Sequence, residues 1–335
     1  MNNKKTKALA HGAICAALSV ILMCLAYYLP FFSTVSVLFA GLPMVFLGTR
    51  YGGRTAAISA MAAIVILPML MGNILSALLL GVLNLLPGVV IGYGIAHRKR
   101  YVTVLAFASG AILLGLVLQI LLLNSMTPDG NGIAAILDEI VLGAKTMMGQ
   151  MIDSLGEAEQ QQLLPVTDTL YQAMDMVKAA FLLYLPTILI AMATALGYGS
   201  IATGIFMLRR LKIRKVTYLP FSMIQASRGV CYLSVILSFI TAFSVSTAPL
   251  TVGLRNMGAL LDCFLAVCGL SLIDNKLSRK VASGYARTGI YAAVFVIGYV
   301  LIGFIGQALI FLGLLDGMMD FRRSYKVGEG YGKDE

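Results

Sequence analysis

The chain has 335 residues, of which 59% are hydrophobic and 12% are charged. A soluble globular domain carries about 25% charged residues, so the composition excludes a soluble protein and predicts an integral membrane protein. The formal net charge of +10 comes from short, scattered basic clusters between apolar stretches, which reflect membrane topology and anionic lipid rather than a nucleic-acid partner.

A membrane-spanning helix needs roughly 20 apolar residues. In chain order, the apolar stretches that approach or meet this length lie at 8–29, 35–49, 54–72, 74–96, 101–124, 179–208, 222–247 and 250–273. With a cytoplasmic N-terminus, nearly all the basic clusters between them fall on the cytoplasmic side, as the positive-inside rule requires. We therefore predict a multi-pass protein of the plasma membrane with a cytoplasmic N-terminus.

The first apolar stretch is too long for a signal peptide and no small-x-small cleavage site follows it, so we retain it as the first span. Tyr27 and Tyr28 near its end are typical of an interfacial aromatic belt. The stretch begins with small residues at helical spacing, which allow another helix to approach closely. These residues are Ala8, Gly12 and Ala16, with Ala13 and Ala17 beside them.

The stretch 125–178 is acidic, whereas most of the chain is basic or apolar. It contains eight acidic residues, Asp129, Asp138, Glu139, Asp153, Glu157, Glu159, Asp168 and Asp175, against two lysines. Apolar residues at helical spacing from Ile133 to Ala144 predict a helix there. We interpret the stretch as two amphipathic helices with a break near Pro165, forming an outward-facing cap. The alternative is a solvated acidic loop without a role.

A last apolar run covers 288–315 and has two interpretations. A single helix of 28 residues would be about 42 Å long, which exceeds a hydrocarbon core of about 30 Å. It would also leave the C-terminal basic residues outside. A hairpin of two short helices that turns near Gly303 and Gly306 returns them to the cytoplasm, and we favour it.

Catalytic and cofactor-binding patterns are missing from the sequence. The five cysteines have no C-x-x-C spacing, the two histidines belong to no ligand-spaced cluster, and no phosphate-binding loop is present. We therefore predict no catalytic residues, no metal site, no cofactor and no ATPase activity in this chain.

Polar residues inside apolar stretches are the usual pointers to function in membrane proteins. Asp262 lies in the middle of the eighth span, and Arg255 lies one heptad earlier. Asp262 either forms a structural hydrogen bond or ion pair, or serves as a proton or ligand site. Asn73 and Asn124 lie at outer span ends, which is typical of interfacial caps, whereas Asn84 and Gln119 lie deeper and need buried partners. Each amide is either a hydrogen-bonding group in helix packing, which we favour, or a ligand contact.

The first 210 residues resemble the substrate-binding S components of energy-coupling-factor (ECF) transporters. The resemblance rests on the lysine-rich start with its alanine-striped helix, on Gly41-Leu42-Pro43, on Gly48-x-x-x-Gly52-Gly53, and on Pro68 and Pro87 inside the next two helices. It implies a six-helix bundle at 1–210 with an acidic helical insert at 125–178. Residues 211–335 would then form a C-terminal extension of three or four membrane segments and a short tail.

The ending Leu312-Gly313-Leu314-Leu315-Asp316-Gly317-Met318-Met319-Asp320-Phe321-Arg322-Arg323 looks like that of the YybS-like family, which are uncharacterised membrane proteins of Gram-positive bacteria. This resemblance covers most of 1–325. The sequence departs from the family around 216–224, where a tryptophan-containing, proline-rich stretch is expected and Tyr218-Leu219-Pro220-Phe221 stands instead.

The S-component resemblance also implies site residues. By analogy, the first helix docks on a transmembrane coupling protein, which acts with ATPases, through Ala8, Gly12, Ala13, Ala16 and Ala17. An outward-facing pocket for an unknown small molecule would involve Tyr27, Tyr28, Asn73, Gln119 and Asn124. No motif for a particular vitamin carries over, and the C-terminal extension counts against ordinary ECF function because it could cover the coupling surface.

Three functions follow from these patterns. The favoured one is an S-component-like small-molecule binding or transport subunit without its own ATPase. The second is a membrane scaffold or regulatory protein that keeps the fold and binds protein partners. The third is an intramembrane enzyme using Asp262, Asp316 and Asp320, for which a helix-end ion-pair cluster with Arg322 and Arg323 is the plainer explanation.

Overall fold

The computed structural model describes residues 3–127, 130–154, 157–213, 220–243, 248–280 and 302–322. Within these ranges the regular elements are helices, and six of them are long and apolar enough to cross a membrane. The chain divides into two compact units, Met1–Tyr218 (unit 1) and Leu219–Glu335 (unit 2). The predicted all-α, multi-pass class is confirmed.

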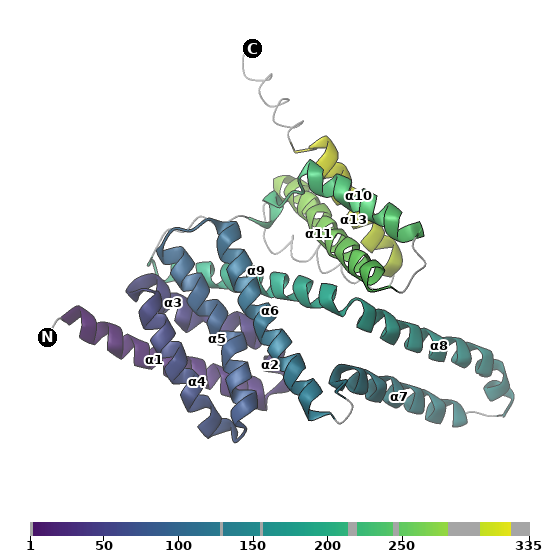
Figure 1. Ribbon diagram of the computed structural model, residues 1–335, viewed down its shortest axis with the longest axis horizontal. Coiled ribbons are helices and arrows are strands. Elements are labelled where there is room, and N and C mark those ends of the chain that lie inside the picture. The colour runs from purple at the N-terminus through teal and green to yellow at the C-terminus, as the bar shows by residue number, and fades with distance from the viewer. Residues whose placement is uncertain are drawn as a thin grey trace, which may run out of the picture. The chain divides into compact units, whose positions relative to one another are not determined.

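Unit 1 contains helices α1 to α9, coloured from purple to teal in Figure 1. Five of them, α1, α4, α5, α6 and α9, are candidate membrane spans. The bounds are α1 Asn3–Tyr28, α2 Pro30–Phe39, α3 Leu42–Tyr51, α4 Gly53–Met71, α5 Ile74–Ala96, α6 Tyr101–Met126, α7 Gly132–Asp153, α8 Glu157–Leu183 and α9 Leu185–Arg210.

The stretch predicted as one span at 35–49 is divided between two helices. α2 ends at Phe39 and α3 begins at Leu42. Pro43 lies in the first turn of α3, where a missing backbone N–H costs nothing because first-turn amides have no partner within the helix. The two short helices together return the chain across the bundle.

One end of unit 1 gathers the basic residues and is called the basic end here. The Nδ1 atom of His11 lies 3.3 Å from the Tyr51 hydroxyl, which joins the start of α1 to the end of α3. Arg54, at the start of α4, and Lys99, just before α6, both border one cavity, so these two helix starts lie at the same end. The end of α9 lies here as well, because Lys212, just after α9, and Arg50 of α3 line another cavity at this end.

The opposite end of unit 1 carries the acidic insert and is called the insert end. There the Tyr28 hydroxyl donates a hydrogen bond to the Leu70 carbonyl at 2.9 Å, joining the end of α1 to the end of α4. The chain therefore runs from the basic end to the insert end along α1, α4 and α6. It returns along α2–α3, α5 and α9.

Small residues bring the backbones of α3 and α5 into direct contact, from the middle of the bundle to the basic end. A Cβ atom added to Gly48 of α3 would lie 2.8 Å from Cα of Gly92 in α5. One added to Gly41 would lie 2.7 Å from the carbonyl oxygen of Asn84. Only glycine permits these approaches, so the Gly48 and Gly92 repeats pack within the chain.

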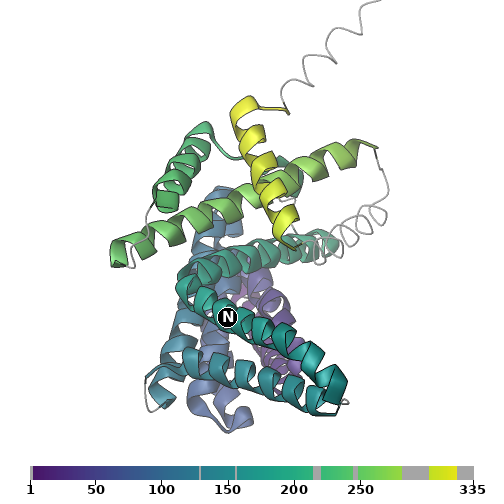
Figure 2. The same ribbon diagram turned by 90° about the vertical axis from the view of Figure 1, so that its right-hand side faces the viewer.

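The insert consists of two helices, α7 and α8, that lie side by side in Figures 1 and 2. The prediction of two helices is confirmed, but the predicted break near Pro165 is wrong. α7 ends at Asp153, α8 begins at Glu157, and Pro165 lies inside α8. A proline removes one backbone hydrogen bond and kinks a helix without necessarily ending it, as Pro68 in α4 and Pro87 in α5 also show.

Unit 2 contains a short 3₁₀ turn at Phe221–Met223 and the helices α10 (Arg228–Phe243), α11 (Pro249–Lys280) and α13 (Ile302–Met319). α11 and α13 cross in Figure 2. A Cβ atom on Gly269 would collide with the Leu309 carbonyl, and one on Gly313 would collide with the Leu265 carbonyl. The two backbones are therefore in contact at the crossing.

The apolar run 288–315 is described only from residue 302, so the choice between one span and a hairpin lies outside the described residues. A turn at Gly303 and Gly306 is nevertheless wrong, because α13 begins at Ile302 and contains both glycines. The Nζ atom of Lys276 in α11 lies 5.8 Å from the Phe321 ring just after α13. The C-terminal ends of α11 and α13 therefore lie at the same end of unit 2.

Candidate functional site

The main cavity of interest lies at the insert end of unit 1 and is called the insert cavity. Its volume is about 360 Å³, and its walls come from α6, α7, α8 and α9. Ten of the eleven lining side chains are apolar, and Gln119 is the exception. The lining residues are Leu116, Gln119, Ile120, Leu123, Ile133, Ile136, Leu137, Phe181, Leu185, Leu189 and Met192.

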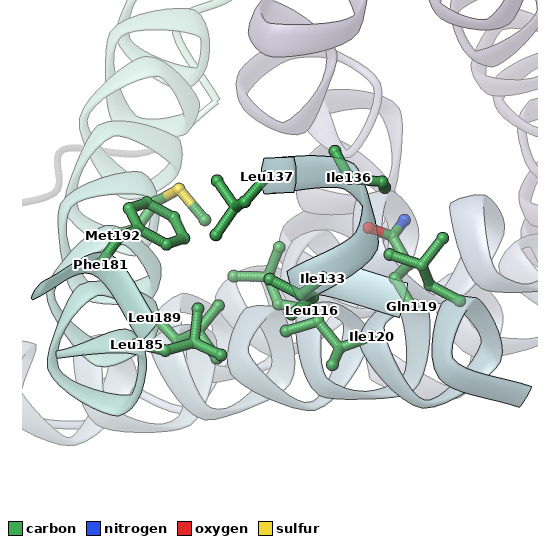
Figure 3. Close-up of a pocket in the computed structure, with 11 residues that line it drawn as sticks. Leu116, Gln119, Ile120, Ile133, Ile136, Leu137, Phe181, Leu185, Leu189 and Met192 are labelled. Carbon is green, nitrogen blue, oxygen red and sulfur yellow. The ribbon is translucent and has the colours of Figure 1, made fainter. Parts of the chain in front are cut away.

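Figure 3 shows how these side chains are arranged around the insert cavity. The Gln119 amide lies beside Ile136 at one edge, and Phe181 and Met192 lie at the opposite edge. A ligand in this space would meet hydrocarbon on most of its surface and one group able both to donate and to accept hydrogen bonds.

A tight reversal after α6 places the apolar face of α7 over the cavity. The Gly130 N–H donates to the Thr127 carbonyl at 3.1 Å, and Gly130 has a φ of 67°, which glycine adopts without strain. A Cβ on Gly132 would lie 2.8 Å from the Leu123 carbonyl oxygen, so the first turn of α7 rests directly on α6. The glycines therefore fix the distance between these two walls.

Ion pairs hold α8 beside α7 and so keep the end of α8 over the cavity. Lys145 Nζ lies 2.8 Å from Asp175 Oδ1, and Lys178 pairs with Asp138. The Tyr171 hydroxyl donates to the Lys145 carbonyl at 3.0 Å. Because such exposed pairs each contribute only about 0.2–1 kcal/mol, their main effect is to fix the register of the two helices.

A second cavity of about 320 Å³ lies on the other side of Gln119, between α1, α5 and α6. Tyr27 and Ser76 line it, and Gln119 and Leu123 line both cavities. The Ser76 N–H is itself held by the side chain of Asn73, which accepts it at 3.1 Å as the N-cap of α5. Gln119 therefore stands in the wall between two apolar spaces.

The structure brings some of the predicted pocket residues together and separates others. Tyr27 and Gln119 line the second cavity. Tyr28 and Asn73 line neither cavity. Tyr28 is exposed and its hydroxyl donates a hydrogen bond to the Leu70 carbonyl, and Asn73 is the N-cap of α5. Asn124 lines neither cavity, although its side-chain oxygen is buried and has no hydrogen-bond partner within the described part of the chain.

The predicted docking residues of α1 divide between two faces. Gly12 and Ala16 are buried, and a Cβ on Gly12 would lie 2.7 Å from the Ser59 hydroxyl oxygen of α4. Ala13 and Ala17 are exposed, and Ala8 is partly buried. A docking face that includes Gly12 and Ala16 is therefore not available on the surface, because Gly12 packs against α4 and Ala16 is buried in the core of unit 1.

The intramembrane charges predicted in α11 have a neighbour in α10. Asp262 Oδ1 accepts a hydrogen bond from the Ser234 hydroxyl at 3.2 Å. Arg255 lies seven residues earlier in α11 and is partly exposed. The hydrogen bond joins α10 to α11, which agrees with a structural role for Asp262. It does not test the alternative role as a proton or ligand site.

Asp316, Asp320 and Arg322 belong to a polar cluster in unit 2. Asp316 is fully buried, and its Oδ2 atom accepts a hydrogen bond from Arg322 Nε at 2.9 Å. The Arg322 guanidinium also donates to the Ser222 carbonyl at 2.6 Å, and Gln225 donates to Asp320 at 3.2 Å. The predicted helix-end ion pair is confirmed for Asp316 and Arg322.

The cavity residues contributed by the insert were missed at the level of sequence. Ile133, Ile136 and Leu137 belong to the apolar periodicity that predicted α7, but that periodicity does not say which element the face covers. Phe181, Leu189 and Met192 give no local signal, because most residues near them are apolar as well. In the described ranges, no three His, Cys, Asp or Glu side chains come together as a metal site.

The fold and the cavities define a class: a multi-pass helical membrane protein with two apolar cavities beside Gln119 at the insert end of its larger unit. Residues 17–317 match a family described as predicted membrane protein (DUF2232). The match covers most of the chain, and the chain belongs to this family. No curated protein and no solved structure matches it.

Proposed function

We propose that the protein is an S-component-like subunit that binds a small molecule for transport and has neither enzymatic activity nor an ATPase of its own. The observation that carries the proposal is the pair of apolar cavities on either side of Gln119 at the insert end. Under this proposal the basic end faces the cytoplasm of a bacterial cell and the cavities face outward.

The path of the chain through unit 1 supports the comparison with S components. Six passages, along α1, α2–α3, α4, α5, α6 and α9, begin and end at the basic end. The insert of α7 and α8 then covers the outward side. We take unit 2, which begins at Leu219, as the C-terminal extension predicted at 211–335. Leu314 and Met318, from the ending that resembles the YybS-like family, pack against its core.

The lining limits the class of ligand. A molecule that fits about 360 Å³ of mostly hydrocarbon wall must itself be mostly apolar. The single amide of Gln119 provides one hydrogen-bonding partner. We therefore propose a hydrophobic ligand with one polar group, and we disfavour sugars, nucleotides and multiply charged compounds because their polar groups would lose water without replacement.

Docking on a coupling protein would use the surface of α1 that remains exposed. Ala13 and Ala17 lie on this surface together with Leu9 and Ile14. Small residues there would allow close approach of a transmembrane helix from a partner. We propose this exposed face in place of the full small-residue stripe.

Mass spectrometry of small molecules retained by the purified full-length protein tests ligand binding. Leu189→Trp fills the insert cavity, and Leu114→Trp places the same indole on an exposed position of α6 as the control. We expect a compound that is enriched by the wild type and by Leu114→Trp but lost from Leu189→Trp. No compound distinguishing the two variants would contradict the proposal.

Co-purification tests docking separately from ligand binding. Ala13→Leu with Ala17→Leu should release a coupling protein and its ATPases, whereas Ala106→Leu, at an exposed position of α6, should not. Retention of the same partners by the Ala13/Ala17 variant would contradict docking through this face.

The scaffold alternative is favoured by one observation, the exposed apolar surface of the insert. Met147 and Met151 of α7 and Met176 and Val177 of α8 are each about 70% exposed. Methionine-rich surfaces adapt to different protein partners. Partners that depend on Met147 and Met151, in a preparation without a retained small molecule, would favour the scaffold.

A further inference from the structure

A groove at the basic end of unit 1 has the composition of a lipid site. It lies between α4, α5 and α6 and has a volume of about 480 Å³. Two cations border it, and most of its remaining surface is apolar. The lining residues are Gly53, Arg54, Ala57, Val89, Val90, Tyr93, Gly94, Lys99, Thr103, Val104 and Phe107.

The part of the groove beside Arg54 and Lys99, called its upper part, combines several positive groups. Arg54 lies in the first turn of α4, and Lys99 lies just before the first turn of α6. The N-cap residues of these helices, Gly52 and Arg100, make no side-chain capping hydrogen bond. The first-turn amides and the positive ends of two helix dipoles therefore add to the two side-chain charges, an arrangement that favours a phosphate.

The sequence supplies no acidic residue to neutralise these cations within the same helices. The first 128 residues contain no aspartate or glutamate, and the eight acidic residues of unit 1 all lie between Asp129 and Asp175 in the insert. The insert begins and ends at the opposite end of the bundle. A negative counter-charge at the groove must therefore come from outside unit 1.

The part of the groove that is farther from the basic end, called its lower part, has the apolar lining that an acyl chain requires. Val90 and Val104 form its wall, and Phe107 is 66% exposed at its lower edge. Phe107 lies six residues after Tyr101, the first residue of α6, which corresponds to about 9 Å along the helix. A Cβ on Gly94 would lie 2.6 Å from Val104 Cγ2, so glycine sets the close spacing of α5 and α6 at the floor.

We propose that this groove binds an anionic phospholipid of the cytoplasmic leaflet. The phosphate lies against Arg54 and Lys99 with the Thr103 hydroxyl near by, and an acyl chain follows Val90, Val104 and Phe107. A free phosphate would use only the upper part and would leave the apolar lower part unexplained. The site lies at the other end of the bundle from the cavities around Gln119 and does not depend on them.

Native mass spectrometry of the full-length protein, purified with phosphatidylglycerol or phosphatidylcholine as the probe, tests this site. Arg54→Gln with Lys99→Gln removes the two charges of the groove. Lys5→Gln with Lys7→Gln removes the same charge from exposed positions at the start of α1 and is the matched control. We expect the groove variant to retain phosphatidylglycerol at least ten-fold less than the wild type, and the control to retain it normally.

A second variant separates a lipid from a free phosphate. Ala57→Phe fills the apolar part of the groove and leaves every charge in place, so it should also lose phosphatidylglycerol. Normal retention by Ala57→Phe, with displacement of the lipid by inorganic phosphate, would overturn the proposal in favour of an anion site. Equal retention of phosphatidylcholine, or unchanged retention by the Arg54/Lys99 variant, would overturn it as well.

Discussion

The two ends of unit 1 differ in charge and in packing, although the same helices form both. The basic end has cations without acidic residues in the helices that carry them, and its glycine contacts press α3 against α5. The insert end has all eight acidic residues of the unit and two apolar cavities on either side of Gln119.

Under the two proposals above, the two ends have separate tasks. Basic residues in helices that contain no acidic residue orient those helices in the membrane and attract anionic lipid. The insert end leaves space between its helices and covers it with the α7–α8 hairpin, which is the arrangement a binding site needs.

The largest expected effect comes from reversing the charge of the basic end. Arg98→Glu, Lys99→Glu and Arg100→Glu together remove the positive signal between α5 and α6. We expect several-fold more protein with this loop on the outer side, or loss of folded protein, because basic residues in short loops determine orientation. Topology reporters fused after residue 126 measure the change.

The matched reversal at the insert end should have little effect on orientation. Asp153→Lys with Asp168→Lys changes the charge of a long segment, and acidic residues contribute little to the positive-inside rule. An orientation change as large as that of the Arg98–Arg100 variant would break the distinction between the ends.

The next effect concerns packing near the basic end. Gly92→Leu places a side chain where a Cβ would already lie 3.0 Å from Cα of Gly48 and from the Met44 carbonyl oxygen. We expect a loss of about 3 kcal/mol in unfolding free energy. Gly110→Leu, where a Cβ meets nothing within 4 Å, should be neutral or slightly stabilising.

Thermal unfolding of both variants in detergent measures the packing difference. A Gly92→Leu protein as stable as Gly110→Leu would show that α3 and α5 are not in direct contact. That result would contradict the close packing of α3 against α5 near the basic end.

The sequence predicts the helices of unit 1 better than the relations between them. Apolar length and basic clusters locate α1, α4, α5, α6 and α9, because lipid requires long, internally hydrogen-bonded helices. The division between α2 and α3 has a local signal in Gly41 and Pro43. The break assigned to Pro165 failed because proline weakens a helix locally, whereas neighbouring contacts decide whether the helix continues.

The candidate site was predictable only in part for a related reason. Tyr27 and Gln119 stand out as polar groups in apolar helices, so their position near a cavity could be predicted. The apolar lining from α7 and α9 could not, because Leu189 and Met192 look the same in sequence whether they face lipid, protein or a cavity. The burial of Gly12 and Ala16 depends on which neighbour covers the stripe, which sequence spacing alone does not determine.

A smaller effect distinguishes a ligand group from helix packing at the insert end. If Gln119 serves a ligand, Gln119→Leu should abolish ligand retention and stabilise the empty protein by about 1 kcal/mol, because an amide leaves an apolar wall. Asn73→Ala, which removes the cap of α5, should instead destabilise it by about 1 kcal/mol. Destabilisation by Gln119→Leu would identify the amide as a packing group.

The smallest effect concerns the ion pairs of the insert. Lys178→Ala removes the contact to Asp138 and should cost about 0.5 kcal/mol, and less at high salt, because the aspartate is exposed. Faster amide hydrogen exchange in α8 is the measurement, with Lys212→Ala as the control. Unchanged exchange would show that the pair does not hold the hairpin.

Cysteine labelling in intact cells tests the opposition of the two ends most directly. His97→Cys, between α5 and α6, and Ser154→Cys, after α7, are compared by reaction with a membrane-impermeant maleimide, with the wild type as background for the native cysteines. We expect Ser154→Cys to react in intact cells and His97→Cys to react only after permeabilisation. Labelling of both, or of His97→Cys alone, in intact cells would contradict this opposition.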